Sequence, residues 1–413
     1  MPSNRFLCRA FLPALMLASV STVPLRADSA DDIKKLWEDA DPEVSLLYRF
    51  GFFDDDLARF DGAASTLQTL VSVQTGKAFG LSGYAQLRNV SAIGDEDFNS
   101  TINGRTAFPV EPDPEATEID QAYLTYEGID NLSISAGRKK LNFGNQRFVS
   151  QVGWRQNHQS FDGVFVDADP LDNLKLTYAY AFNVNRIFTG DSPIGDIGGD
   201  THLANLEYSI PELGKVTAYG YWLNFNEAFS RGIQTRTLGA NLTGSQKLDD
   251  ITFGYVIEAA HQTDISDNPN DINLGYYRLE PKITWKGLAL RGGVEVLSGN
   301  GRQGFQAPLS LLHAYNGFAD RFLTTPADGL EDIYIEAAYK FGGDTVLNGL
   351  RAVVAYHEFR ASETNDEYGT EWNMLITKRL FGRVNALLKL AIYDANGFSE
   401  DVTKLWFQIS TKF

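Results

Sequence analysis

The sequence predicts an all-β transmembrane protein, an antiparallel up-and-down β-barrel of about 18 strands with short periplasmic turns and long extracellular loops. Three observations lead to this prediction. Apolar and polar residues alternate with a period of two along most of the chain, which is the pattern of half-buried strands. Short and long links alternate between these segments along the chain. The chain also ends on an alternating segment, whose last residue is Phe413.

Residues 1–27 have the features of a secretory signal peptide. Arg5 and Arg9 come before an apolar run over residues 11–23, and Ala27 is a small residue directly before an acidic stretch. A basic segment, an apolar segment and a small residue at the cleavage point are the parts of such a signal. The alternative, a buried N-terminal helix, is opposed by a proline and an abrupt change to acidic residues after the run. We therefore expect the mature chain to be exported.

Composition narrows the classes of protein further. The only cysteine, Cys8, lies inside the signal, so we expect neither disulfides nor a cysteine metal site in the mature chain. Without Arg5, Arg9 and Arg26 the formal charge goes from −17 to −20, which opposes a nucleic-acid partner. After the signal, no stretch approaches the roughly 20 apolar residues that a membrane-spanning helix needs. The sequence therefore excludes a spanning helix.

The strands are expected in a barrel over residues 43–413, after a short polar periplasmic segment over residues 28–42 that is helical or irregular. The clearest strand is residues 174–185, "LKLTYAYAFNVN", in which six larger apolar residues alternate with six small or polar ones. Most of the alternating segments have about 8–13 residues, the length that a tilted strand needs to cross a bilayer.

The links also indicate the architecture. Short links such as "GIDN", "PELGK", "WKG" and "LFG" alternate with long ones, which cover residues 91–117, 140–160, 187–202 and 298–330. This segregation is typical of bacterial outer-membrane barrels, and it is not expected of a β-sandwich or a propeller. An even number of strands places both chain ends on the periplasmic side. A secreted all-β domain is the alternative.

Closure of the sheet follows from the lack of water in the bilayer. Because every backbone N–H and C=O there needs a partner within the protein, a sheet is viable only if it has no open edge. We therefore expect the final segment to pair with the first, near "EVSLLYRF". The terminal Phe413 resembles the C-terminal signature of outer-membrane proteins. It predicts contact with the outer-membrane assembly machinery, in a Gram-negative outer membrane whose lipid surrounds the barrel.

If the apolar residues face lipid, the opposite parity lines the lumen, and basic residues outnumber acids there. The inward basic residues are Arg49, Arg88, Lys139, Lys175, Arg278, Lys282, Arg291, Lys340, Arg351, Arg379, Lys389 and Lys404; the inward acids are Glu127, Glu207, Glu258, Glu280, Glu295, Glu336 and Glu371. The acidic excess is expected in loops and turns such as "VEPDPEATE". Either these groups pair across neighbouring strands, or the lumen attracts anions, because a low-dielectric wall focuses the field of its charges.

One long loop with its flanks combines cations, a ring and amides. It contains Arg138, Arg147, Trp154 and Arg155, which suit sugar acids: arginine grips carboxylates with two hydrogen bonds, amides bind hydroxyls and a ring stacks on the sugar. We expect the loop to narrow the channel. Strand parity places Arg138 toward lipid, although Gly137 offers a bulge that would re-aim it. The alternative is a loop that only packs against the rim.

Four segments, "EIDQAYLTYEG", "NQRFVSQVGWRQNHQSFDGV", "YAYAFNVNRIFTGDSP" and "APLSLLHAYNGFADRF", resemble the alginate export family of bacterial outer-membrane proteins. The resemblance implies an eighteen-stranded barrel through which an anionic uronate polysaccharide diffuses along a positively charged pore, and it allows for periplasmic export partners. The resemblance implies that Arg138, which precedes the central segment, and Arg147, Arg155 and Asp162 within it match the family's central motif. With the lumen arginines, the expected substrate-binding residues are Arg49, Arg88, Arg138, Arg147, Arg155, Asp162, Arg278, Arg291 and Arg351.

Signals for catalysis are weak, and we expect no enzyme activity, no cofactor and no metal site. His158 and Ser160 are close in sequence, but nothing indicates a third group that would orient the histidine as a base. The expected function is passive passage of an anionic uronate polysaccharide or oligosaccharide. The alternatives are a general or nutrient-uptake porin that prefers anions and, more distantly, an outer-membrane lipase-type hydrolase.

Overall fold

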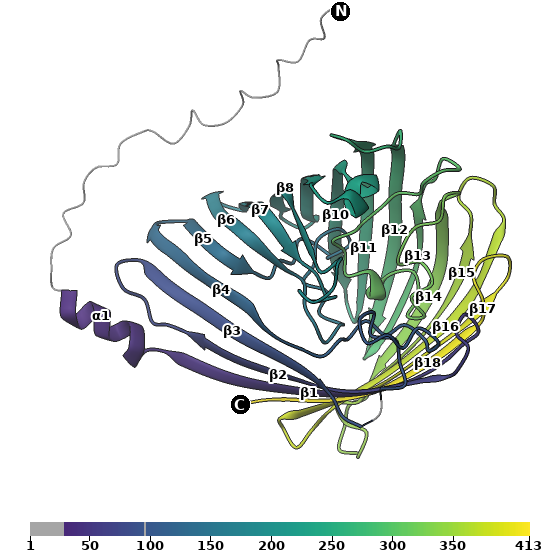
Figure 1. The fold of residues 1–413 in the computed structure, drawn as a ribbon, viewed down its shortest axis with the longest axis horizontal. Coiled ribbons are helices and arrows are strands. Elements are labelled where there is room, and N and C mark those ends of the chain that lie inside the picture. The colour runs from purple at the N-terminus through teal and green to yellow at the C-terminus, as the bar shows by residue number, and fades with distance from the viewer. Residues whose placement is uncertain (1–28, 95) are drawn as a thin grey trace, which may run out of the picture.

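A computed structural model describes residues 29–94 and 96–413. The predicted signal peptide over residues 1–27, with Cys8, lies outside the described residues. The described chain begins with helix α1 (Ser29–Glu38) and then forms a single antiparallel sheet of 18 strands that closes on itself (Figure 1). None of the helices in the described ranges is long and apolar enough to cross a membrane.

The strands are eight to fifteen residues long. They are β1 (Asp41–Asp55), β2 (Gly62–Gln74), β3 (Leu81–Ala92), β4 (Ala116–Ile129), β5 (Leu132–Lys139), β6 (Ser160–Leu171), β7 (Leu174–Asn185), β8 (Asp196–Ile210), β9 (Gly214–Phe225), β10 (Thr235–Leu248), β11 (Ile251–Asp264), β12 (Asn273–Trp285), β13 (Leu288–Leu297), β14 (Leu330–Lys340), β15 (Arg351–Arg360), β16 (Glu367–Leu380), β17 (Val384–Ala395) and β18 (Val402–Lys412).

Each strand pairs with its neighbours in sequence, and β1 also pairs with β18. The register sets Arg49 opposite Gln408, and Val44 and Phe413 exchange two backbone hydrogen bonds of 3.1 and 2.9 Å. The predicted closed barrel, and the predicted pairing of the last segment with the first, are therefore confirmed. Closure gives every strand two partners, which a sheet in hydrocarbon requires.

The two faces of the wall differ as the period of two predicts. On β18 the outward Leu405 and Phe407 are 37% and 39% exposed, whereas the inward Trp406 is fully buried. The outward row of apolar side chains continues around the barrel, because lipid offers polar groups no hydrogen-bond partners.

Loops and turns segregate to opposite ends of the barrel, as predicted. The long loops cover residues 93–115, 140–159 and 298–329, and we call their end extracellular. The range predicted for one loop, residues 187–202, extends too far, because β8 already begins at Asp196. Its first outward residues, Asp196, Asp200 and His202, are polar, so the alternation there does not stand out in the sequence.

Helix α1 lies at the periplasmic end, within the segment predicted over residues 28–42 (Figure 1). Its last turn packs against the β2–β3 turn, where the Gly76 N–H donates to the Leu36 carbonyl oxygen. A Cβ at Gly76 would lie 2.1 Å from the Lys35 carbonyl oxygen, so this contact requires glycine. Strand β1 follows at Asp41, two residues before the predicted start of the barrel.

The interior of the barrel is filled by its own loops (Figure 1). Phe148 of the β5–β6 loop packs against Tyr219, Tyr221 and Tyr276 of the wall and against Phe305 of the β13–β14 loop. Buried rings of this kind carry a large apolar area out of water. The two loops therefore form a folded core inside the lumen.

Candidate functional site in the loop-filled lumen

Arg147 fixes both inner loops to the barrel wall. Its Nε donates to Oε1 of Glu295 on β13 at 2.9 Å, and its Nη2 donates to Oδ1 of Asn316 in the β13–β14 loop at 3.1 Å. The guanidinium lies 4.7 Å above the ring of Tyr315. Burial alone would lower the pKa of Arg147, but Glu295 outweighs it and the pKa is raised. The pair is thus a fixed, charged anchor.

Arg155 joins three elements at the centre of the lumen. It pairs with Glu111 of the β3–β4 loop at 2.9 Å and with Asp320 of the β13–β14 loop at 2.7 Å. Burial opposes the charge of Arg155, yet the two carboxylates raise its pKa. Burial would raise the pKa of Asp320, but hydrogen bonding from His313 and the charge of Arg155 hold it below its usual value.

These contacts correct one expectation. The acids of "VEPDPEATE" were expected to remain outside a basic lumen, but Glu111 and Asp113 are each only 1% exposed and lie inside it. Asp113 accepts from Arg49 at 3.3 Å and from the Gln156 N–H at 2.7 Å. Burial of two carboxylates inside the lumen is favourable only because the arginines compensate their charge.

A stack of rings and cations, which we call the central stack, lies beside this cluster and consists of Arg49, Trp154, His313, Phe318 and Lys389. The Trp154 and His313 rings are parallel with centroids 4.3 Å apart, and Arg49 lies 4.1 Å over Trp154. Nζ of Lys389 is 3.9 Å from the Trp154 ring and 3.5 Å from the Phe318 ring. Cations over aromatic faces are held by the ring quadrupole.

His313 is neutral in this stack, because burial, reinforced by the neighbouring Lys389, sets its pKa well below the usual value. The neutral ring, protonated at Nδ1, donates to Oδ1 of Asp320 at 2.8 Å and accepts at Nε2 from the Lys389 amine at 2.6 Å. The ring therefore connects the loop to β17 without carrying charge.

The β13–β14 loop is also fixed to β16. The backbone N–H groups of Phe318 and Ala319 donate to Asn373 at 3.0 Å and to Glu371 at 2.8 Å. Gly317, with a φ of +84°, passes close to the same carboxylate, and a Cβ there would lie 2.2 Å from it. Glycine at this position thus permits the loop to dock.

Arg88 secures the other end of the β5–β6 loop. It donates to Asn157 at 3.0 Å and pairs with Glu118 at 2.6 Å and with Asp120. His158 lies in the same cluster, between Asp120 and Lys140, and burial lowers its pKa. Arg88 is therefore occupied by protein groups.

The expected arginines of β12, β13 and β15 differ among themselves. Arg278 and Arg291 share Glu280, at 2.7 and 3.4 Å, and Arg291 also pairs with Glu336 at 2.5 Å. Arg351 is exposed at the start of β15, and no carboxylate of the described residues lies within 4.0 Å of it. Pairing thus accounts for most of the expected lumen arginines.

Arg138 and Asp162 lie outside the lumen. They face each other across β5 and β6, with hydrogen bonds of 2.7 and 3.0 Å, on the row that includes the outward Ala122. The expected bulge at Gly137 is absent, because the β5 register is regular on both sides of that residue. The nearby bulge is at Phe182 on β7, which has no partner opposite Asp162 and Gly163. The expectation that Arg138 turns into the pore is therefore wrong.

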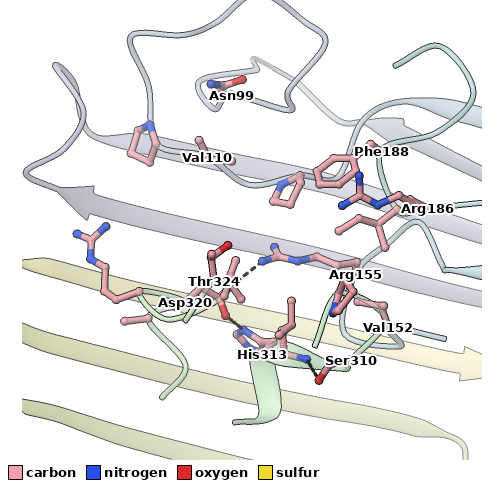
Figure 2. A pocket seen from close by; sticks show the side chains of 18 of the residues that line it. Asn99, Val110, Val152, Arg155, Arg186, Phe188, Ser310, His313, Asp320 and Thr324 are labelled. Atoms are coloured by element: carbon pink, nitrogen blue, oxygen red, sulfur yellow. Dashed lines mark hydrogen bonds and ion pairs between the residues drawn. The ribbon is translucent and has the colours of Figure 1, made fainter. Parts of the chain in front are cut away.

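Between and beside the loops lie three cavities. One of them, which we call the vestibule pocket, has a volume of about 630 Å³ and opens among the β3–β4, β7–β8 and β13–β14 loops (Figure 2). A second cavity of about 220 Å³, the lysine pocket, is lined by Lys139, Lys140 and Lys175 with Phe143 and Tyr178. A third, of about 60 Å³, lies beside Arg278 and Tyr315.

The vestibule pocket contains a residue that sequence reasoning missed. Arg186 directly follows the best alternating segment of the chain, so its position at the mouth of the barrel could have been found from the end of that strand. Burial lowers its pKa to about 10. Lys404, which parity placed inward, lines the same pocket but was not among the expected binding residues.

A closed 18-stranded barrel with an apolar outer belt, a charged interior and inward-folded loops defines an outer-membrane channel. The alginate export family model matches residues 44–263, just over half of the chain. The chain therefore belongs to the alginate export family, and it resides in the bacterial outer membrane.

Solved structures agree on the fold. OccAB4 of Acinetobacter baumannii superposes with a TM-score of 0.73 at 14% identity, covering 91% of this chain and 98% of that one. A BenF-like porin from Pseudomonas fluorescens Pf-5 gives 0.72 at 12% identity, covering 92% and 99%. OccK3 (OpdO) of Pseudomonas aeruginosa gives 0.70 at 14% identity, covering 92% and 97%. No curated protein matches the sequence. The family and these neighbours are channels and not enzymes.

Proposed function

We propose that this protein is a passive channel for small organic anions, with the extracellular loops acting as a selective screen. The observation that carries the proposal is the division of the lumen into cavities of about 630, 220 and 60 Å³ by two docked loops. The vestibule pocket lies within the range of about 300–1,000 Å³ that small-molecule pockets occupy, and the two other cavities are smaller. This corresponds to the nutrient-uptake alternative considered from the sequence.

The fixed position of the loops supports the proposal. Removing one partner of a buried ion pair costs about 3–5 kcal/mol. Arg147 forms one such pair with the wall, and Arg155 forms two with neighbouring loops. A polymer strand would have to displace these anchors along its whole passage, whereas a small solute has to pass only between them.

The charges that remain available favour anions. Lys139, Arg186 and Lys404 line the vestibule and lysine pockets, and none has a carboxylate oxygen of the described residues within 4.0 Å. A cation without a counter-charge in a low-dielectric channel raises the local concentration of anions. Together with the arginines, these groups favour anion passage over cation passage.

Passage of a uronate polysaccharide is the second candidate, and the match to the alginate export family favours it. It requires both inner loops to leave the lumen. Arg49, Arg88, Arg147 and Arg155 would then be released toward the pore, and together with Arg278, Arg291 and Arg351 they would line a wide basic passage. Periplasmic export partners would belong to this second candidate.

Single-channel recording in a planar bilayer distinguishes the two candidates. We expect a small conductance and, in a salt gradient, a reversal potential whose sign shows that anions permeate better than cations. Small carboxylates should block the current at concentrations where uronate oligomers have no effect. Cation preference, or block by uronate oligomers but not by small carboxylates, would contradict the proposal.

We also propose that β18 and the terminal Phe413 that follows it contact the outer-membrane assembly machinery. The side chain of Phe413 is 66% exposed, so its packing contributes little to the finished barrel. Phe413→Ala should therefore lower the amount of protein in the outer membrane several-fold and leave its conductance unchanged. Normal membrane levels of the variant would contradict this role.

A further inference from the structure

The vestibule pocket combines apolar walls with cations that the fold leaves without counter-charges. Its apolar lining comes from several loops and includes Leu57, Val110, Val152, Phe188 and Leu323. Val110 and Leu323 are 51% and 39% exposed. In Figure 2, Val110, Phe188 and Arg186 lie on one side of the pocket, with Val152, His313 and Asp320 on the other. A ligand between the two sides would contact both loops.

Lys404 is one of the cations that line this pocket. The residue is only 5% exposed, yet its amine has no hydrogen-bond partner and no carboxylate within 4.0 Å among the described residues. The Lys404 amine is open to the pocket, so a solute there can reach it. An anion in the pocket would supply the missing partner.

Arg186 provides a second cation. Its Nη1 donates to the Ile194 carbonyl oxygen at 3.0 Å and its guanidinium lies 4.6 Å over the Phe188 ring, so it is held in place by neutral groups. A guanidinium in this position keeps donors free for a carboxylate.

The other charged side chains in the lining of the pocket are paired. Asp320 pairs with Arg155 at 2.7 Å and Asp55 with Arg321 at 2.7 Å. Arg186 and Lys404 are therefore the cations of the lining that pair with no carboxylate of the described residues, which suits a ligand that carries a carboxylate.

We infer that the vestibule pocket binds a small monocarboxylate with an apolar body, such as an arylalkanoate or alkanoate, with its carboxylate toward Lys404 and Arg186 and its body against Val110, Phe188 and Leu323. This inference rests on the proposed function and names the substrate class that the channel selects. Each Å² of apolar surface removed from water contributes about 25 cal/mol, so the apolar walls favour such a body.

A sugar acid fits this pocket less well. Its hydroxyls would lose water against apolar walls, which costs free energy unless each finds a hydrogen-bond partner. The lysine pocket, with Asn142, Asn205 and Glu207 in its lining, offers such partners. The inference therefore predicts selection at the entrance by the apolar body.

The test is calorimetric titration of the full chain in detergent with 3-phenylpropionate and with glucuronate, which carry the same charge. We expect 3-phenylpropionate to bind at least about tenfold more tightly, equivalent to about 1.4 kcal/mol. Equal or tighter binding of glucuronate would overturn the inference.

Variants locate the site. Lys404→Gln and Arg186→Gln should each weaken 3-phenylpropionate binding about tenfold, and Val110→Ser with Leu323→Ser should weaken it several-fold without affecting glucuronate. Lys175→Gln, in the lysine pocket, is the matched control and should leave this binding unchanged. Retained affinity in Lys404→Gln, with circular dichroism showing an intact sheet, would overturn the inference.

Bilayer recordings distinguish a failure of this inference from a failure of the proposed function. An anion-selective channel blocked by small carboxylates, in which 3-phenylpropionate binds no better than glucuronate, would refute only this inference. A cation-selective channel would refute the proposed function, whatever the calorimetry shows.

Discussion

Arg155 and Lys404 line the same pocket, yet they differ in what their charge can do. Arg155 is held between two carboxylates at 2.9 and 2.7 Å, whereas Lys404 has none within 4.0 Å among the described residues. The first charge serves to dock three loops, and the second remains available to a solute. The number of cations in a lumen therefore does not measure its affinity for anions, because carboxylates of the inward-folded loops pair with many of these cations.

The largest expected effect comes from breaking an anchored pair. Arg147→Ala leaves Glu295 buried without its cation, which should weaken loop docking by about 3–5 kcal/mol. We expect single-channel conductance to rise several-fold and to become noisy.

Arg351→Ala is the matched control, since Arg351 is exposed and anchors neither inner loop. Unchanged conductance in Arg147→Ala would show that the loops are held by other contacts.

The next effect separates paired from unpaired cations directly. Arg186→Gln combined with Lys404→Gln should lower the anion-to-cation permeability ratio by roughly tenfold, measured as the reversal potential in a salt gradient.

Arg291→Gln combined with Glu336→Gln removes an ion pair at constant net charge, and it should leave the ratio unchanged. If this second combination shifts the reversal potential as much as the first, paired and unpaired cations do not differ in their effect on selectivity.

A smaller effect is expected from pH. The pKa of His313 in the docked loop lies well below its usual value because of burial, while Asp320, Lys389 and Arg155 surround the ring. A released histidine has a pKa of about 6.5 and binds more protons below that pH, so docking weakens as the pH falls through about 6.5. Conductance noise should therefore increase between pH 7.5 and pH 5.

His313→Gln, which cannot titrate, should flatten this pH dependence. His158 has a lowered pKa for the same reason and should retain a residual response in that variant. A pH-independent wild-type channel would contradict the neutral state of both rings.

The smallest effect is expected on the outer wall. Arg138→Ala removes a pair in which the arginine side chain is 32% exposed, and such pairs contribute about 0–1 kcal/mol. Ion selectivity should not change, because the pair does not face the lumen. A clear loss of anion selectivity in this variant would show that Arg138 reaches the pore after all.

The barrel could be predicted from the sequence because the alternation that defines each strand lies within a short run of residues. Segments such as β7 show their inner and outer faces in the order of their residues, and closure follows from the demand of backbone groups for partners. The inner face of the strands, including Arg49, Arg88 and Arg278, followed from parity alone.

The candidate site could be predicted only in part, because it depends on contacts between irregular loops. Nothing local indicates that Arg155 meets Asp320, 165 residues later in the chain, or that Glu111 folds inward to meet the same arginine. Loops have no period from which their direction can be read, so the sequence showed the charges but not their pairing.

The seam between β1 and β18 has a consequence for biogenesis. The free edge of β1 receives its partner from β18 (Val402–Lys412). This pairing has the greatest sequence separation in the sheet and is the slowest to form. A polypeptide that stops early would keep two unpaired edge strands, which can pair with strands of other chains. Premature termination should therefore yield an aggregating sheet and never a narrower pore, so the seam acts as a check on full-length synthesis.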